Sequence, residues 1–339
     1  MSDTDVRPPD SATDSDRPRR LKVRSTLDDK VFQTLARGAG LLVLAITGGI
    51  GVFLATQSGI AFDTFGWRFF SELQWNPENN ALGIAAILPG TVVVAAIAIL
   101  VAFPLALTTA LYISEYAPPR IRATLVSLLD LMAAVPSVVY GLWGFYFLQP
   151  QIIYLARWLH QAFGSFIPFL DVDTDPDAAG WEASRYTSSA FIAGVVVALM
   201  VLPIAASVMR EVFAQAPPGE REAALALGST RWGMVRAVVL PFGRGGIIGG
   251  TMLGLGRALG ETIAVAMIIS PAFDLDFRVL ENGEITVSSL IALRFGESSA
   301  LQLSALLAAG LVLFAFTLLI NTLAAIVVSR SRSGSATDI

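Results

Sequence analysis

The chain contains no cysteine and only one histidine, His160, among its 339 residues. Disulfide staples and cysteine metal sites are therefore excluded, and no metal-ligand cluster is visible. Charge is also scarce, because Asp, Glu, Lys and Arg make up 15% of the chain, where a soluble domain carries about 25%. With 54% hydrophobic residues and a mean hydropathy of +0.65, the composition predicts apolar helices in a bilayer rather than a water-soluble globule.

Lysine is nearly absent as well. Lys22 and Lys30 are the only two, and neither lies in a glycine-rich phosphate loop, so the chain cannot bind ATP in the P-loop manner. No nucleophile stands beside a general base, which argues against an enzyme. A net charge of -4 gives no support to nucleic-acid binding. Any energy source, and any bound ATP, must then belong to another chain, and no cofactor is expected here.

Long uncharged runs predict an all-α membrane protein with six transmembrane helices. A bilayer core about 30 Å thick needs about 20 helical residues, because lipid offers the backbone no hydrogen-bond partner. Six apolar runs are found, at 38–62, 81–114, 131–156, 186–209, 245–273 and 298–329. The run 245–273 holds Arg257 and Glu261, and the other five hold no Asp, Glu, Lys or Arg. Pro89 and Pro104 predict a kink or an irregular start in the second run, and Pro136 predicts a bend in the third.

Lys and Arg are concentrated in alternate connecting segments. The tail 1–37, the loops 115–122 and 210–244 and the C-terminus hold 17 of these residues, whereas the other loops hold five. Cytoplasmic flanks of membrane helices accumulate positive charge, so both termini are predicted to be cytoplasmic.

The first residues are rich in Asp, Ser, Pro and Arg and hold almost no bulky apolar side chains. We therefore expect a disordered cytoplasmic tail over 1–34, a transmembrane domain over 35–332 and a C-terminal tail over 333–339. Basic side chains in the first tail are suited to contacts with anionic membrane lipid, although the topology signal explains them equally well.

Residues 217–241, PPGEREAALALGSTRWGMVRAVVLP, predict a cytoplasmic elbow of two short helices around one sharp turn. The two prolines favour a helix start and the glutamates complement its dipole. Gly228 can supply a left-handed stop, and Ser229 or Thr230 can cap the second helix, which Pro241 is expected to end. The predicted apolar face of that second helix consists of Trp232, Val235, Val238 and Val239.

The elbow resembles the signature loop of ABC-importer permeases, written E-A-A, three residues, G, nine residues, I, one residue, L-P. The positions of this pattern are filled by Glu222, Ala223, Ala224, Gly228, Leu240 and Pro241. Val238 stands where the pattern usually has Ile. The resemblance implies that the elbow docks into a groove on a separate ATPase and that Pro241 passes motion rigidly into the fifth crossing.

The fifth crossing has small and charged residues at intervals of three and four, namely Gly246, Gly250, Gly254, Arg257 and Glu261. This spacing places them on one face of a continuous helix, and glycines at that spacing favour close packing inside a bundle. An Arg near the bilayer centre costs about 2.5 to 3.5 kcal/mol, which makes a lipid-facing side chain unfavourable.

Two interpretations of the charged pair remain open. Arg257 and Glu261 can form an i,i+4 ion pair that only stabilises the helix. Alternatively they line a substrate pathway, in which the planar guanidinium binds the oxygens of an anion and Glu261 neutralises it when the path is empty.

Three segments, GLGRALGETIAV, AAVPSVVYGLWGF and VLPIAASVMREVF, resemble the PstC family of phosphate ABC transporter permease subunits, and the likeness runs from about residue 82 to 328. The resemblance implies type I ABC importer permease architecture and phosphate import through the cytoplasmic membrane. It also implies a second permease subunit like PstA, an ATPase dimer like PstB and an external phosphate-binding protein like PstS.

The residues alone leave other functions open. A guanidinium does not tell tetrahedral anions apart, so sulfate or molybdate is an alternative cargo. An ion-gradient-driven carrier with Glu261 as its proton site and a scaffold or sensor without transport are further alternatives. The ATPase-docking pattern and the missing inverted repeat argue against the carrier.

Weaker candidates lie outside these motifs. Asp171, Asp173, Asp175 and Glu182 occupy positions 1, 3, 5 and 12 of a calcium-loop pattern, but Pro176 stands where that pattern needs Gly, so a solvated acidic loop is favoured.

Single polar residues near the predicted crossings have local interpretations. Asp130 can pair with Arg122 or line the inner exit of the pathway, and local pairing is expected. The hydroxyls of Ser137 and Tyr140 suit either a polar pathway or hydrogen bonds between helices. His160, beside two aromatic residues, is expected to be an interfacial residue.

Overall fold

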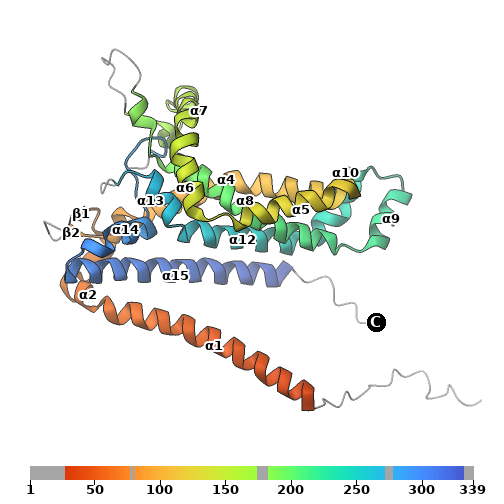
Figure 1. Ribbon diagram of the computed structural model, residues 1–339, viewed down its shortest axis with the longest axis horizontal. Coiled ribbons are helices and arrows are strands. Elements are labelled where there is room, and N and C mark those ends of the chain that lie inside the picture. The colour runs from red at the N-terminus through yellow and green to blue at the C-terminus, as the bar shows by residue number, and fades with distance from the viewer. Residues whose placement is uncertain (1–26, 77–78, 80, 174–181, 272–277, 332–339) are drawn as a thin grey trace, which may run out of the picture. The chain divides into compact units, whose positions relative to one another are not determined.

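The computed structural model describes residues 27–76, 79, 81–173, 182–271 and 278–331 (Figure 1). The chain divides into two compact units, 1–50 and 51–339. Helices dominate both, as the composition predicts. The one ribbon of strands in the described part pairs β1 (Trp75–Asn76) with β2 (Ala81–Leu82) in antiparallel fashion.

The N-terminal helix α1 (Leu27–Gln57) starts earlier than predicted. Residues 1–26 of the expected disordered tail and the expected tail 333–339 lie outside the described residues. Residues 27–34 are helical, so the predicted end of the tail at 34 was wrong. The physical reason is that Asp28 and Asp29 lie in the first turn, where their charges complement the helix dipole.

Four helical stretches are long and apolar enough to cross a membrane, namely Leu27–Gln57, Ile84–Tyr116, Ala190–Ala214 and Ala300–Val328. They correspond to the first, second, fourth and sixth predicted runs. Two pairs of helices pass the same test only together, because each is bent: Pro119–Ala134 with Ser137–Phe163 by 90° and Arg231–Phe242 with Arg244–Gly260 by 68°. The described chain therefore holds four to six candidate spans.

The second predicted run has an irregular start, as its prolines indicated. A 3-10 turn, η2 (Ile84–Ala86), leads into α4 (Leu88–Leu111), where Pro89 occupies the first turn and needs no hydrogen-bond donor. The helix continues past Pro104 and ends in a π-helix, η3 (Tyr112–Tyr116).

The predicted bend at Pro136 is confirmed and is sharp. Helix α5 (Pro119–Ala134) stops at Val135, whose ψ of 128° is extended, because a residue before proline is pushed out of the helical region. The chain resumes as α6 (Ser137–Trp143), and the Tyr140 hydroxyl donates to the Met132 carbonyl across the break at 3.0 Å. A π-helix η4 (Gly144–Leu148) and helix α7 (Gln149–Phe163) follow.

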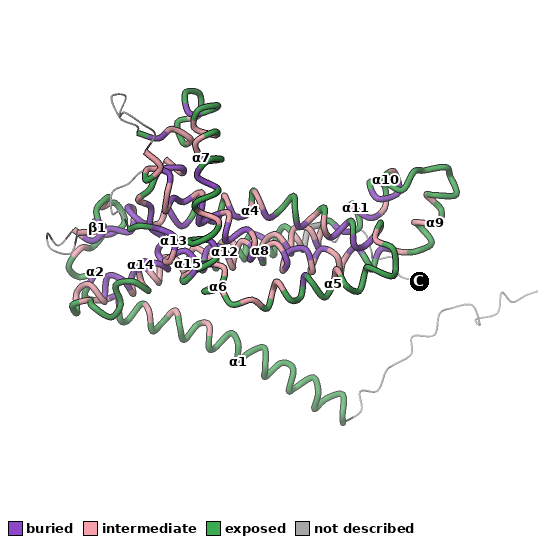
Figure 2. The backbone as a smooth tube through the Cα atoms, turned by 45° about the horizontal axis from the view of Figure 1, so that its top comes forward, coloured by how far each residue is buried: buried purple, intermediate pink, exposed green. Residues whose placement is uncertain are grey.

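Helix α8 (Ala190–Ala214) lies at the centre of unit 51–339. It packs along α4 and against α12 (Arg244–Gly260), and buried residues are concentrated along these helices (Figure 2). Small and β-branched side chains such as Ala193, Val197 and Ala206 are fully enclosed there. Close helix packing follows from their size.

The remaining elements complete unit 51–339. They are α2 (Gly59–Phe65), α3 (Arg68–Ser71), η5 (Pro168–Leu170), η6 (Ala183–Tyr186), α9 (Pro218–Ala226), α10 (Arg231–Met234), η7 (Val235–Val239), α11 (Leu240–Phe242), α13 (Ile263–Ile268), α14 (Val287–Arg294), η8 (Phe295–Glu297) and α15 (Ala300–Ser331).

The break between α1 and α2 is closed by a residue of the last helix. The Ser304 hydroxyl donates to the Gln57 carbonyl at 2.8 Å and accepts from the Ala61 backbone N–H at 3.1 Å. Both backbone groups are thus satisfied away from water, as a buried chain break requires.

Candidate functional site

The glycine face of α12 lies against α8, which confirms the predicted packing inside the bundle. A Cβ added at Gly246 would come within 2.5 Å of Val212, and one added at Gly254 within 2.5 Å of Val201. Since real Cβ atoms do not approach so closely, the two helices can touch here only because these positions carry no side chain.

The predicted helix face does not continue to Glu261. Helix α12 ends at Gly260, and Glu261 has an extended ψ of 124°. No ion pair joins Arg257 to Glu261 among the described residues. The expectation of one face with an i,i+4 contact was therefore wrong, because it assumed an unbroken helix through a Gly and a β-branched Thr262.

Glu261 is instead bound at the break between α12 and α13. Its carboxylate accepts a hydrogen bond from the Ala264 backbone N–H at 3.3 Å, and its backbone carbonyl accepts from the Ser288 hydroxyl at 2.8 Å. Only 9% of the residue is exposed. Glu261 therefore ties the broken helix to α14, and interrupted membrane helices of this kind are found where backbone lines a cavity.

Arg257 lines a cavity of about 590 Å³ between α8, α12 and α15. Its Nε is buried and has no hydrogen-bond partner in the described part of the chain. The walls are mostly apolar and include Ile204, Met252, Leu253, Phe314, Thr317 and Asn321. A second cavity of about 560 Å³ shares Met252, Leu253 and Asn321 and extends along the same two helices, α12 and α15.

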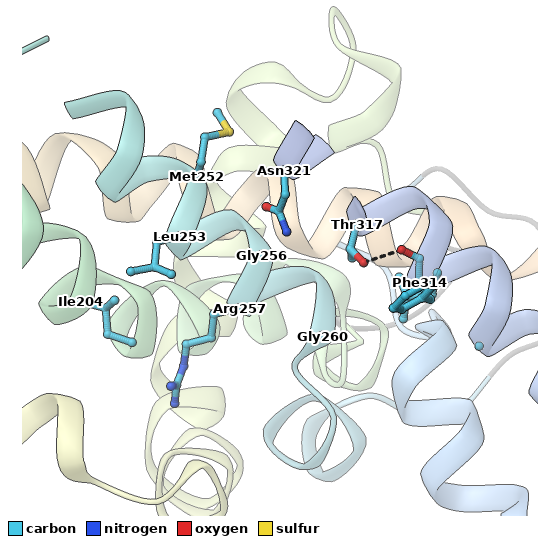
Figure 3. Close-up of a pocket in the computed structure, with 11 residues that line it drawn as sticks. Ile204, Met252, Leu253, Gly256, Arg257, Gly260, Phe314, Thr317 and Asn321 are labelled. Carbon is cyan, nitrogen blue, oxygen red and sulfur yellow. Dashed lines mark hydrogen bonds between the residues drawn. The ribbon is translucent and has the colours of Figure 1, made fainter. Parts of the chain in front are cut away.

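The guanidinium group of Arg257 is directed away from Asn321 and Thr317 (Figure 3). The Thr317 hydroxyl is engaged with its own helix, since it donates to the Phe314 carbonyl at 2.9 Å. A guanidinium at an apolar cavity, with its Nε free of described partners, is suited to bind an anion through paired oxygens.

The elbow has the predicted form of two short helices about a left-handed turn. Helix α9 ends at Ala226, Gly228 has a φ of +84°, and the Thr230 hydroxyl caps α10 by accepting from the Gly233 N–H at 3.1 Å. A φ in this region strains any residue with a Cβ, which explains why Gly stands there.

Pro241 does not end the second helix of the elbow, which continues to Phe242. The expected stop at Pro241 was wrong because the preceding turn is the π-helix η7, in which the Leu240 N–H bonds to the Val235 carbonyl. This wider turn accommodates a proline that lacks a donor. The chain bends by 68° between Phe242 and Arg244, at the start of α12.

The residues of the E-A-A pattern differ in exposure. Ala224 and Leu240 are half-buried against a core cluster, whereas the exposed members are Glu222, Ala223, Gly228 and Pro241. Two apolar side chains outside the pattern are also exposed, Leu227 by 89% and Trp232 by 56%. The elbow therefore exposes apolar side chains as well as charged ones.

The predicted apolar face of the second helix is only partly buried, since Trp232 on that face is 56% exposed. Val235 and Val239 are buried as predicted, and Val238 is half-buried. The π-helix over Val235–Val239 has more residues per turn than an α-helix, so the face does not follow the α-helical spacing along its whole length.

The acidic loop shows no metal arrangement in its described part. Asp171 lies 3.6 Å from His160 Nδ1, and Glu182 pairs with Arg185 at 3.0 Å. Asp175 and Pro176 lie outside the described residues. No group of three or more His, Asp or Glu that could hold a metal ion is found among the residues that the structure describes.

The expected pairing of Asp130 with Arg122 is not found between these two described residues. Arg122 donates to the backbone carbonyls of Ile113 and Ser114 instead. These carbonyls belong to η3, and the sequence gives no sign that η3 lies beside the start of α5.

An ion-pair network on the loops before α8 and α14 was missed. Glu281, with 9% of its side chain exposed, pairs with Arg185 at 3.0 Å and with Arg278 at 3.1 Å. Burial raises the pKa of the neighbouring Tyr186, and Asp171 and Glu281 raise that pKa further against the lowering effect of Arg157. No local signal could have predicted the pair, since 96 residues separate Arg185 from Glu281.

Comparisons with known proteins agree with this fold. Residues 102–333 match the family described as binding-protein-dependent transport system inner membrane component. The chain is 35% identical over 315 residues to the phosphate transport system permease protein PstC of Mesorhizobium japonicum, covering 92% of this chain and 94% of the relative. It is 33% identical over 301 residues to the PstC protein of Pasteurella multocida, covering 88% and 91%.

A solved bacterial ABC transporter involved in the import of the acidic polysaccharide alginate has a similar fold. Its TM-score is 0.55 at 18% identity, and the match covers 89% of this chain and 99% of the solved chain. The relatives are transport permeases rather than enzymes. The chain belongs to the family of binding-protein-dependent transport system inner membrane components, as a relative of the PstC permease proteins.

Proposed function

We propose that this chain is the permease subunit of an ATP-driven importer that passes inorganic phosphate across the cytoplasmic membrane by alternating access. The observation that carries the proposal is Arg257, whose guanidinium lies at a cavity among apolar helices with a buried Nε that no described residue partners. The relatives named as phosphate transport permeases support phosphate as the anion. A planar guanidinium can hold two phosphate oxygens at once.

The proposed topology has six crossings with both termini in the cytoplasm. Each of the two bent helix pairs then serves as one crossing. The distribution of Lys and Arg supports this orientation, since the alternate segments that would be external hold only five of them.

The proposed partners are a second permease subunit like PstA, an ATPase dimer like PstB that binds the ATP, and an external phosphate-binding protein like PstS. The elbow would dock the ATPase through its exposed residues Glu222, Ala223, Leu227 and Trp232. Membrane lipid surrounds the apolar helices, and no nucleic acid is involved.

The elbow continues directly into the helix that carries the proposed pathway residue. Leu240 and Pro241 lead through Phe242 to the 68° bend and from there into α12, which carries Arg257. Movement of the docked elbow would therefore reorient α12 and expose Arg257 to alternate sides of the membrane. Glu261 has a different part from the one first expected, because its carboxylate holds the break at the end of α12 rather than neutralising Arg257.

The decisive test is radiolabelled phosphate uptake into proteoliposomes that hold this chain with its co-purifying partners and ATP on the side of the ATPase. We expect ATP-dependent phosphate uptake that excess sulfate and molybdate do not inhibit. Uptake of sulfate or molybdate instead would keep the importer and change its cargo. Uptake driven by a proton gradient without ATP would refute the importer.

The elbow has its own test in Gly228→Val. A β-branched residue at a φ of +84° costs at least about 1 to 2 kcal/mol, so the turn should change shape. We expect lost ATPase docking or ATP hydrolysis without uptake. Full uptake by this variant would remove the elbow from the mechanism.

A further inference from the structure

A half-buried ion pair joins the elbow to η3, the π-helix that follows α4. Glu115 lies in the π-helix η3, and 4% of its side chain is exposed. One carboxylate oxygen accepts a hydrogen bond from the Ser114 hydroxyl at 2.6 Å and lies 3.3 Å from a terminal nitrogen of Arg221. Arg221 belongs to α9, the first helix of the elbow.

Arg221 also holds the end of α8. The same terminal nitrogen donates to the Phe213 carbonyl in the last turn of that helix. Its Nε is buried without a hydrogen-bond partner among the described residues, and 22% of its side chain is exposed. The Arg221 side chain therefore lies where α8, α9 and η3 meet, and its charge is compensated there by Glu115.

The π-helix that carries Glu115 is itself fixed to α5. Arg122 donates to the Ile113 and Ser114 carbonyls of η3. Ile113 belongs to the same core cluster as Met234 and Val235 of the elbow. The elbow is thus attached to the α4–α5 corner by apolar packing and by one ion pair between described residues.

We propose that Glu115 is a positioning residue for transport, and that its pair with Arg221 makes movement of the elbow reach α4 and α5 as well as α12. The proposal rests on the proposed function, in which the elbow docks an ATPase. The covalent connection through Pro241 leads only into α12, whereas the ion pair acts on the opposite end of the elbow. Only 4% of the Glu115 side chain is exposed, so removing Arg221 leaves this carboxylate uncompensated with little access to water, and the pair resists separation. π-helices within membrane helices are frequent at functional positions.

The test compares charge changes at the pair in the complete complex. The variants are Glu115→Gln, Arg221→Gln and the exchange Glu115→Arg with Arg221→Glu. Phosphate uptake and ATP hydrolysis are measured in the same proteoliposomes, and the amount of co-purified ATPase reports assembly. The matched control exchanges an exposed pair of the same residue types, Arg68→Glu with Glu72→Arg, whose side chains are 86% and 30% exposed and 4.0 Å apart.

Each single variant should lower the number of phosphates imported per ATP by about tenfold, because the elbow then moves without α4 and α5. The exchange should restore at least part of this ratio, although the carboxylate introduced on α9 would face the Phe213 carbonyl. The exposed control should stay within about twofold of the wild type.

Two results would overturn the proposal. One is an unchanged ratio of uptake to hydrolysis in both single variants. The other is loss of assembly in both that the exchange does not restore, because that pattern belongs to a structural contact without a part in transmission. The wild-type complex separates this failure from that of the proposed function. If the wild type shows no ATP-dependent uptake, the importer itself is refuted. If the wild type shows such uptake, the variants test only the role of Glu115.

Discussion

The glycines on the two sides of α12 have different surroundings. On the side facing α8, a Cβ at Gly246, Gly250 or Gly254 would collide with atoms 2.5 to 2.9 Å away. On the side facing the cavities, a Cβ at Gly249 would meet nothing within 4 Å. The first side fixes the helix, whereas the second leaves space beside Arg257. One short helix therefore combines a rigid contact with an open site, and glycine serves opposite purposes on its two sides.

The largest effect is expected from leucine on the packed side. Gly254→Leu would force its side chain into Val201, and overpacking of this kind costs about 1 to 3 kcal/mol or more. We expect a lower midpoint of thermal unfolding in detergent, or no folded protein. Gly249→Leu is the matched control on the open side and should unfold within a few degrees of the wild type. Equal losses in both variants would contradict the difference between the two sides.

Arg257→Gln should give the next largest effect, on transport rather than stability. Charge-assisted hydrogen bonds contribute about 1.5 to 3 kcal/mol, so ATP-driven phosphate uptake should fall by about tenfold or more. Thermal unfolding should change little, since the described structure gives the guanidinium no ion pair. Arg257→Lys keeps the positive charge but lacks the planar guanidinium, so its phosphate uptake should lie between that of the wild type and that of Arg257→Gln. Unchanged uptake in Arg257→Gln would leave the open side without a substrate contact.

Glu261→Gln is expected to have a smaller effect. The amide oxygen can still accept from the Ala264 N–H, so only the advantage of a charged acceptor, about 1 kcal/mol, is lost. Phosphate uptake should fall by no more than about tenfold. The variant also discriminates between mechanisms, because a carrier that uses Glu261 as its proton site would lose all gradient-driven uptake.

Asn321→Ala should have the smallest effect. Asn321 lines both cavities, but the Arg257 guanidinium is directed away from it (Figure 3). We expect phosphate uptake within about twofold of the wild type, as for a substitution outside the binding contacts. A loss as large as that of Arg257→Gln would extend the site across to α15.

Local patterns predicted much of the fold because their physical causes are local. The apolar runs, the bend at Pro136, the left-handed turn at Gly228 and the packed glycines of α12 all follow from a residue and its near neighbours. The break before Glu261 was missed because nothing in the spacing marks it. The π-turn over Val235–Val239 was not predicted, because no residue in that segment marks a change in the period of the helix.

Contacts between distant residues could not be predicted from one sequence. The pairing of Arg185 with Glu281 depends on how two loops meet, and that of Glu115 with Arg221 on how the elbow folds back. At the site, Arg257 and Glu261 were predicted from the sequence as functional candidates. The absence of an ion pair between them and the shape of the cavity were not, because both depend on where α12 ends.

The hydroxyl of Ser304 also sets an order of events in biosynthesis. It bonds to Gln57 and Ala61, and 243 residues separate Ala61 from Ser304. When the ribosome has just synthesised α1, it has not yet made Ser304, whose hydroxyl donates to the Gln57 carbonyl at the end of that helix. The junction between α1 and α2 therefore reaches its final hydrogen bonding only after residue 304 has been made, which makes it a late step in folding.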